Sequence, residues 1–203
     1  MNVQEVIDIA KYSELNNLSV KDNNEAIVSF MNLGMIELYT RFPIKTEEYS
    51  TALVEDQSVY DLPNNFMYAL SVYSDTGTDG ELEEYPINDT SNAYSVTFPD
   101  WKTVQVPDTI TGSLITIIYV AKPTTISVDS LTSSIDLPDT LVDALVSYIG
   151  YRGNLGIRGD AQSEGASHWQ RFERNCKKAR ELGVAFPIDK LDMSTRINAR
   201  GFV

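Results

Sequence analysis

The segment from Asn23 to Pro43, NNEAIVSFMNLGMIELYTRFP, determines how the rest of the chain divides. Its apolar residues recur at helical spacing, and Asn23 or the preceding Asp22 can cap the first turn. Pro43 ends the periodicity, because the residue before a proline is pushed out of the helical region. Leu33 and Ile36 widen the apolar stripe enough to predict packing on two sides. The stripe consists of Ile27, Phe30, Met31, Gly34, Met35 and Leu38.

Beyond Pro43 the period changes to that of strands. Short runs rich in Tyr, Val, Ile and Thr alternate with turn residues over residues 44–136, which is typical of antiparallel sheets. Because no crossover helix intervenes, a small sandwich or barrel is favoured over a parallel sheet. The expected strands are Glu47–Glu55, Phe66–Tyr73, Leu82–Ile87, Tyr94–Phe98, Trp101–Val106 and Ser113–Val120.

Helical spacing returns after residue 136. Pro138 fits the first turn of a helix that continues to Arg152, and a glycine-containing break follows it. A long helix then covers about Ala161–Leu182, with Gly183 just past its end. Its packing stripe is Trp169, Phe172, Cys176 and Ala179, and its other faces carry Arg171, Arg174, Lys177, Lys178 and Arg180. A short amphipathic helix at the other end of the chain is marked by Val3, Val6, Ile7 and Ala10.

These patterns predict the α+β class, with a helical bundle built from the N- and C-terminal segments and an inserted antiparallel β-sandwich or barrel. The predicted divisions are N-terminal helices over 1–43, the inserted β domain over 44–136, C-terminal helices over 137–183 and an extended docking tail over 184–203.

The charge is divided unequally along the chain. Residues 1–150 carry six basic and 23 acidic side chains, a net charge of −17, whereas residues 151–203 carry ten basic and six acidic side chains, a net charge of +4. An acidic body repels nucleic acid, while a basic end is attracted to an acidic partner surface. The five cations of the last helix are therefore expected to dock a protein rather than to bind nucleic acid.

Composition argues against membrane insertion, secretion and disulfide bonding. No apolar run approaches the roughly 20 residues of a membrane span, and the residues after Met1 lack the features of a secretory signal. The single cysteine excludes an internal disulfide and favours folding in a reducing compartment.

The residues capable of chemistry are better explained as packing or surface residues. His168 has no nucleophile motif around it and is expected at a core edge or an interface. Cys176 lies on a packing stripe and is expected to act as a small hydrophobe. Glu81, Glu83 and Glu84 offer a carboxylate pair for a glycosidase, but their strand-like alternation favours exposure instead.

A calcium loop and a nucleotide-binding loop are also disfavoured. Counted from Asp75 of the acidic loop 75–81, Gly77 and Pro86 occupy positions 3 and 12, where an EF-hand needs side-chain ligands. No phosphate-binding motif occurs. The chain is therefore expected to be no enzyme and to hold no cofactor or metal ion.

Two stretches, Ser58–Phe66 and Asp136–Asp139 with the two helices after it, carry a resemblance. They resemble the head–tail connector (adaptor) proteins of tailed bacteriophages, closest to tail tubular protein A and related portal-adaptor rings of podophages. Ser58–Phe66, SVYDLPNNF, is similar to the "Y-x-L-P-x-x-F" that precedes a strand in such adaptors. Asp136–Asp139, DLPD, followed by two helices, is similar to their C-terminal helical pair, and Ala161, Trp169, Phe172 and Arg174 follow the pattern of its second helix.

The resemblance implies a structural subunit of the virion at the head–tail interface, assembled in the cytoplasm of the host bacterium. Its partners would be eleven further copies in a dodecameric ring, the portal protein and a tail tube or nozzle protein. Double-stranded DNA would pass through the lumen during genome ejection without specific binding, and no membrane would be involved. The implied docking residues are Trp169, Phe172, Arg174, Lys178, Phe186, Ile188, Leu191, Arg196, Arg200 and Phe202.

Two other functions remain open from the sequence. A carbohydrate- or protein-binding β-sandwich module of a virion or tail fibre could use Tyr85, Tyr94 and Trp101 as an aromatic platform. A hydrolase could assemble carboxylates such as Glu83 and Glu84 only in three dimensions.

Overall fold

The computed structural model describes residues 1–75, 82–155 and 161–183. It is a mixed α+β fold, as predicted, and the chain forms two compact units. Of the described residues, the helical unit comprises Met1–Ile44 and those from Pro123 onward, and the β unit comprises those within Lys45–Lys122. The segment 123–136, which the sequence analysis assigned to the β domain, therefore groups with the helices.

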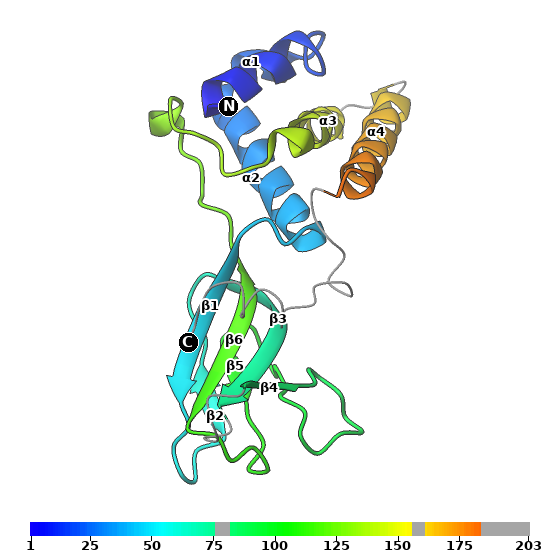
Figure 1. Ribbon diagram of the computed structural model, residues 1–203. Coiled ribbons are helices and arrows are strands. Elements are labelled where there is room, and N and C mark those ends of the chain that lie inside the picture. Colours follow the sequence, from blue (N-terminus) through cyan, green and yellow to red (C-terminus); the bar gives the residue numbers. More distant parts are fainter. Residues whose placement is uncertain (76–81, 156–160, 184–203) are drawn as a thin grey trace. The chain divides into compact units, whose positions relative to one another are not determined.

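The helical unit contains four α-helices and three short 3₁₀ helices in its described residues (Figure 1). Helix α3 packs against both α2 and α4, and α1 packs on α3. The α-helices are α1 (Val3–Tyr12), α2 (Asn24–Arg41), α3 (Val142–Asn154) and α4 (Ala161–Glu181). The 3₁₀ helices are η1 (Ser19–Asp22), η2 (Val128–Ser130) and η3 (Asp139–Leu141).

The helix ends follow the local chemistry of the sequence. Asn23 caps α2, since its side-chain oxygen accepts a hydrogen bond from the Ala26 backbone N–H at 3.0 Å. Gly183 has a φ of +71°, the left-handed conformation that glycine adopts most readily after a helix. The helix predicted to start after Pro138 begins as η3 and becomes regular only at Val142.

Helix α2 packs through one face, contrary to the prediction of two. Leu33 and Ile36 are exposed on its other side. At Gly34, a Cβ atom would lie 2.6 Å from Leu145 Cδ1 and 3.0 Å from Tyr148 Cδ1, so a larger residue would force these side chains of α3 to shift. The buried residues of α2 are Ile27, Val28, Met31, Gly34, Met35, Leu38 and Tyr39.

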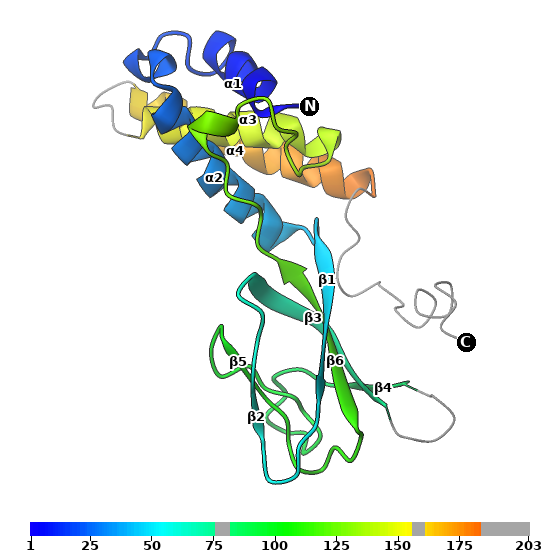
Figure 2. The ribbon, with the colours of Figure 1, turned by 90° about the vertical axis from the view of Figure 1, so that its left-hand side faces the viewer.

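The β unit contains a four-stranded antiparallel sheet, in the order β1-β6-β3-β4, and a two-stranded sheet of β2 and β5 (Figure 2). Side chains from both sheets share one apolar core, which includes Tyr60 of β2, Val72 of β3, Val104 of β5 and Ile117 of β6. The strands are β1 (Thr46–Ala52), β2 (Val59–Asp61), β3 (Phe66–Asp75), β4 (Leu82–Tyr85), β5 (Thr103–Gln105) and β6 (Leu114–Ala121).

Two strand predictions differ from the structure. Val59–Asp61 forms β2, which the sequence analysis treated only as the approach to the next strand. The predicted strand Tyr94–Phe98 makes only isolated bridges, Ile87 with Val96 and Thr97 with Gln105.

The residues of the SVYDLPNNF motif anchor the β unit. The Tyr60 hydroxyl accepts a hydrogen bond from the Val54 N–H at 3.0 Å and donates one to the Gln57 carbonyl at 2.8 Å. Further along the motif, the Asn65 amide donates to Glu47 Oε2 at 2.7 Å. This motif therefore fixes the loop after β1 as well as the start of β3, where Phe66 stacks on Phe98.

Candidate docking surface

Helix α4 is amphipathic, and its buried side holds it against the rest of the helical unit. Its buried side chains include Phe172, Cys176 and Ala179, as predicted from their spacing. Burial raises the pKa of the Cys176 thiol to about 11, so the thiol is protonated at neutral pH and acts as a small apolar group.

An aromatic cluster lies where α3 meets α4. Ring centroids are 5.4 Å apart for Tyr148 and Phe172, 5.2 Å for Trp169 and Phe172, and 5.0 Å for Tyr151 and Trp169. These tilted and edge-to-face arrangements are the ones that aromatic pairs prefer. The cluster consequently fixes the rotation of α4 about its own axis, which in turn decides which residues face solvent.

Arg41, in the last turn of α2, closes this cluster from the other side. Its guanidinium carbon lies 4.7 Å from the Phe172 ring centroid and 5.5 Å from that of Trp169. Its nitrogens also lie 2.7 Å from Glu37 and 2.9 Å from Glu173. Burial alone would lower the pKa of Arg41, but the hydrogen bonds to Glu37 and Glu173 raise it above its ordinary value, so this cation stays charged.

The structure separates the four predicted docking residues that it describes into two groups. Phe172 has 0% of its surface exposed, which leaves none for a partner and makes it a core residue. Trp169 is partly buried against Tyr151 and Phe172. Arg174 and Lys178 are exposed. The other six predicted docking residues, Phe186, Ile188, Leu191, Arg196, Arg200 and Phe202, lie outside the described residues.

The exposed cations of α4 differ in how far they are already paired. Arg171 reaches Glu14 at 3.2 Å, Lys177 lies 3.9 Å from Glu181, and Arg180 lies over the Phe42 ring at 5.3 Å. Within residues 1–75, 82–155 and 161–183, Arg174 and Lys178 form no ion pair. Because they are four residues apart, they lie on one face of the helix. This pair is therefore the most available positive charge on α4.

His168 lies at the edge of the core, as the sequence indicated. It is 9% exposed, and its Nδ1 lies 2.6 Å from Glu14 Oε2. Gly150 makes room for it, since a Cβ atom there would lie 2.9 Å from the same nitrogen. Within the part of the chain that the structure describes, no serine or cysteine hydrogen-bonds to its ring. The contact with Glu14 instead joins the loop after α1 to α4.

The carboxylates considered for hydrolysis do not form a pair across a cleft. Glu83 and Glu84 are exposed neighbours on β4, and successive residues of a strand point to opposite faces. Glu81 lies outside the described residues. Among the residues with described positions, no group of three or more His, Cys, Asp or Glu side chains could hold a metal ion.

The aromatic platform proposed for carbohydrate binding is incomplete. Tyr85 is buried, and its hydroxyl donates a hydrogen bond to Glu83 at 2.8 Å. Tyr94 and Trp101 are 53% and 58% exposed. The three side chains therefore do not share one exposed surface.

Over the described ranges, no helix has the length and apolar character needed to cross a membrane.

Sequence reasoning missed the residues that orient α4. Arg41 and Tyr148 lie more than a hundred residues apart in the chain, and both meet Phe172. No local pattern reveals such a meeting, because it depends on how α2 and α3 pack. The only local signal is that Arg41 is a cation in the last turn of a helix, where the negative end of the helix dipole stabilises it.

Comparison with known proteins adds one finding. The model of the SU10 adaptor protein family matches residues 1–196, which include every described helix and strand. No curated protein matches the chain.

Proposed function

Because the chain belongs to the SU10 adaptor protein family, a family of phage head–tail adaptors, we propose that it is a structural subunit of a head–tail connector ring. The ring docks under the portal, extends the DNA channel toward the tail and provides the platform on which the tail assembles. Each subunit contributes to a ring of twelve copies, within a virion assembled in the bacterial cytoplasm. A structural role, with no catalytic step, agrees with the family.

The observation that carries the docking part of the proposal is the arrangement of α4. Phe172, Cys176 and Ala179 pack its apolar side against the helical unit, whereas Arg174 and Lys178 are exposed without ion-pair partners among the described residues. Two uncommitted cations on a rigid helix suit a contact with an acidic partner surface. We assign that surface to the portal, with Trp169 at the border of the contact and the residues after Gly183 extending it.

The exposed side of α2 supports the ring. Leu33 and Ile36 are 41% and 49% exposed, and Thr40, one turn further on, is exposed as well. These residues occupy one helical face, which a neighbouring copy can cover in a closed ring. The acidic character of residues 1–150 suits a channel wall that DNA passes without binding.

The double variant Arg174→Glu/Lys178→Glu is expected to bind portal rings about tenfold more weakly at low salt, because two attractive contacts become repulsive. The defect should shrink as salt is raised, since screening weakens exposed charge pairs. Surface plasmon resonance on immobilised portal measures the affinity at each salt concentration.

The matched control is Lys11→Glu/Lys21→Glu, which changes the net charge equally but lies on α1 and η1. If the chain docks through α4, this control should bind the portal with the affinity of the wild type. Equal affinity for the α4 variant and the wild type would show that these two cations do not face the portal.

A further inference from the structure

The β unit concentrates its few cations at one end. It contains 13 acidic residues and only three basic ones, Lys45, Lys102 and Lys122. The Lys102 and Lys122 ammonium groups lie 4.6 Å and 4.9 Å from the ring centroid of Trp101, which is 58% exposed. Lys45 lies at the same end, because its carbonyl accepts a hydrogen bond from the Ala121 N–H beside Lys122. We call Trp101, Lys102 and Lys122 the knob.

The backbone holds this group of side chains in place. The Asp100 carboxylate accepts hydrogen bonds from the N–H groups of Lys102 and Thr103 at 2.7 Å and 2.8 Å, which fixes the turn that carries Trp101. The Lys122 ammonium donates to the Asn64 carbonyl at 3.1 Å. A large aromatic side chain exposed between two positioned cations has the composition of an interface hot spot.

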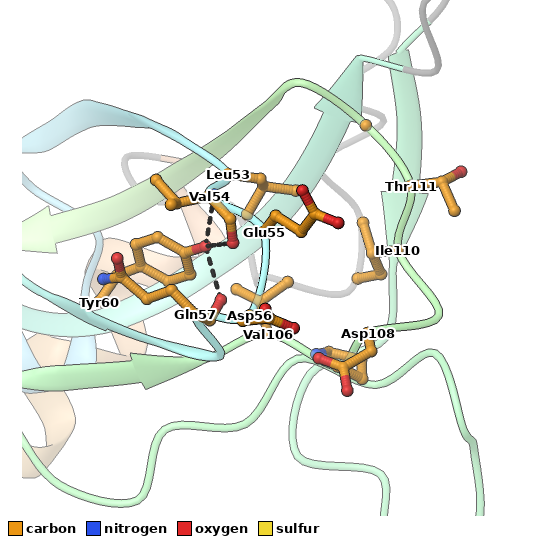
Figure 3. A pocket seen from close by; sticks show the side chains of 12 residues that line it. Leu53, Val54, Glu55, Asp56, Gln57, Tyr60, Val106, Asp108, Ile110 and Thr111 are labelled. Atoms are coloured by element: carbon orange, nitrogen blue, oxygen red, sulfur yellow. Dashed lines mark hydrogen bonds between the residues drawn. The ribbon is translucent and has the colours of Figure 1, made fainter.

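The β unit also contains a pocket of about 480 Å³, at the end of β6 opposite to Lys122. Figure 3 shows Tyr60, Val106 and Ile110 lining it, and all three are largely buried apolar residues of the core. Glu55 and Asp108 also line it, and both are exposed. The pocket therefore has a small apolar floor of nearly buried core side chains, a largely polar exposed lining and two carboxylates at its rim, and its volume falls in the range of ligand sites in proteins. We call it the tip pocket.

The knob and the tip pocket of one chain cannot meet each other. Lys122 follows the last residue of β6, and Gly112 of the pocket precedes its first residue. The eight residues of β6 span roughly 25 Å at the rise of an extended strand. Lys122 therefore cannot reach the pocket of its own chain, whereas a second copy can bring a whole knob to it.

We propose that the knob of one subunit inserts into the tip pocket of a second copy of this chain. The Trp101 ring would cover the apolar floor, and Lys102 and Lys122 would move to the carboxylates of Glu55 and Asp108. Such a contact joins two different surfaces of identical subunits, the type of contact that closes into a ring when the rotation between copies allows it. The inference deepens the proposed ring and rests on it, since it names one of the contacts between its subunits.

A second copy is favoured over nucleic acid as the occupant. Phosphate backbones would meet the 13 carboxylates of the β unit as well as its three cations, whereas the tip pocket offers both apolar surface and negative charge where the knob needs them. Binding of DNA at the knob is therefore an outcome that the test must detect.

The test combines a truncation of Trp101 with charge reversals at the knob and at the tip pocket. Mass photometry measures how much ring each variant forms, with and without portal. Trp101→Ala, Lys102→Glu/Lys122→Glu and Glu55→Lys/Asp108→Lys are each expected to shift assembly to about tenfold higher protein concentration. The chain that carries all four charge reversals should regain assembly, because reversed knobs then meet reversed pockets. Asp56 is left unchanged, since its φ of +64° disfavours most other side chains.

The control Tyr94→Ala removes another exposed aromatic side chain of the β unit and should assemble like the wild type. Rings that form equally well from all variants would overturn this contact while leaving the proposed ring intact. A wild-type chain that stays monomeric in every condition would overturn both. Loss of binding to a duplex DNA probe in Lys102→Glu/Lys122→Glu, with unchanged assembly, would assign the knob to nucleic acid and overturn the contact.

Discussion

Replacing Phe172 by alanine is expected to lower the free energy of unfolding of the helical unit by about 3–5 kcal/mol. The side chain is completely buried, and it touches the rings of Tyr148 and Trp169 as well as the Arg41 guanidinium. Its removal leaves a cavity between α2, α3 and α4 that these large neighbours can fill only in part. The loss also removes the contact that fixes the rotation of α4.

The two units can be followed separately during unfolding. The chain has two tryptophans, Trp169 in the helical unit and Trp101 in the β unit. In a Trp101→Phe background, fluorescence comes from Trp169, beside the substituted position. Chemical denaturation of this background with and without Phe172→Ala should show a lower midpoint with an unchanged slope.

A second aromatic residue of the helical unit provides the control for this prediction. Tyr12, at the end of α1, is 82% exposed, so Tyr12→Ala should change stability by less than about 0.5 kcal/mol. If Phe172→Ala cost no more stability than this control, Phe172 would not be the core residue described, and its side chain would be available to a docking partner.

Truncation after Gly183 is expected to abolish docking to the portal while leaving a folded subunit. The prediction rests on the sequence of residues 184–203, in which spaced apolar residues and arginines suit contacts with a groove on a partner protein. The cut falls after the glycine that ends α4, so every described helix and strand is retained. Pull-down on portal rings measures docking, and circular dichroism measures folding.

A full-length variant with Phe186→Ser, Leu191→Ser and Phe202→Ser separates the role of the apolar residues from that of chain length. It should dock as poorly as the truncated chain if these side chains supply the binding energy. Portal binding by the truncated chain at the affinity of the wild type would refute the role of the tail.

The helices of this chain could be predicted because their determinants are local. Asn23 and Gly183 identify helix ends by their own conformational chemistry, and Pro43 stops the periodicity that defines α2. The stripe of α4 was likewise visible from its spacing, and with it the separation of buried residues from exposed cations.

The boundary of the β unit could not be predicted, because long-range contacts set it. The Asn32 side chain exchanges two hydrogen bonds with the backbone of Ile126, at 3.0 Å and 2.9 Å. The Tyr39 hydroxyl donates to the Asp136 carbonyl at 2.7 Å. These contacts tie the segment after β6 to α2, although the segment has no helical period of its own.

The strand errors have a similar origin. β2 has only three residues, too few for any periodicity to show, and it exists because β5 pairs with it. Tyr94–Phe98 has the composition of a strand, but its backbone is held partly by a side chain, since the Phe98 N–H donates to Asn88 Oδ1 at 2.9 Å. Composition alone cannot distinguish these two outcomes.

The exposure of the candidate docking residues could not be predicted one by one, and their role in docking stays a prediction. Arg174, Lys178 and Phe172 share a helix, and the sequence placed all three at the interface. Only the packing of α2 and α3 shows that Phe172 is enclosed while the two cations are free to meet a partner. The knob and tip pocket were not predicted, because Trp101, before β5, and Lys122, after β6, flank strands of different sheets and meet only in the folded β unit.

The central claim is that this chain forms a ring on the portal, and electron microscopy of the two purified proteins tests it most directly. Class averages of the mixture should show portal rings that carry one additional layer of density with twelvefold symmetry, absent from portal alone. Portal particles that remain bare at saturating subunit concentration, with the chain monomeric beside them, would contradict the claim.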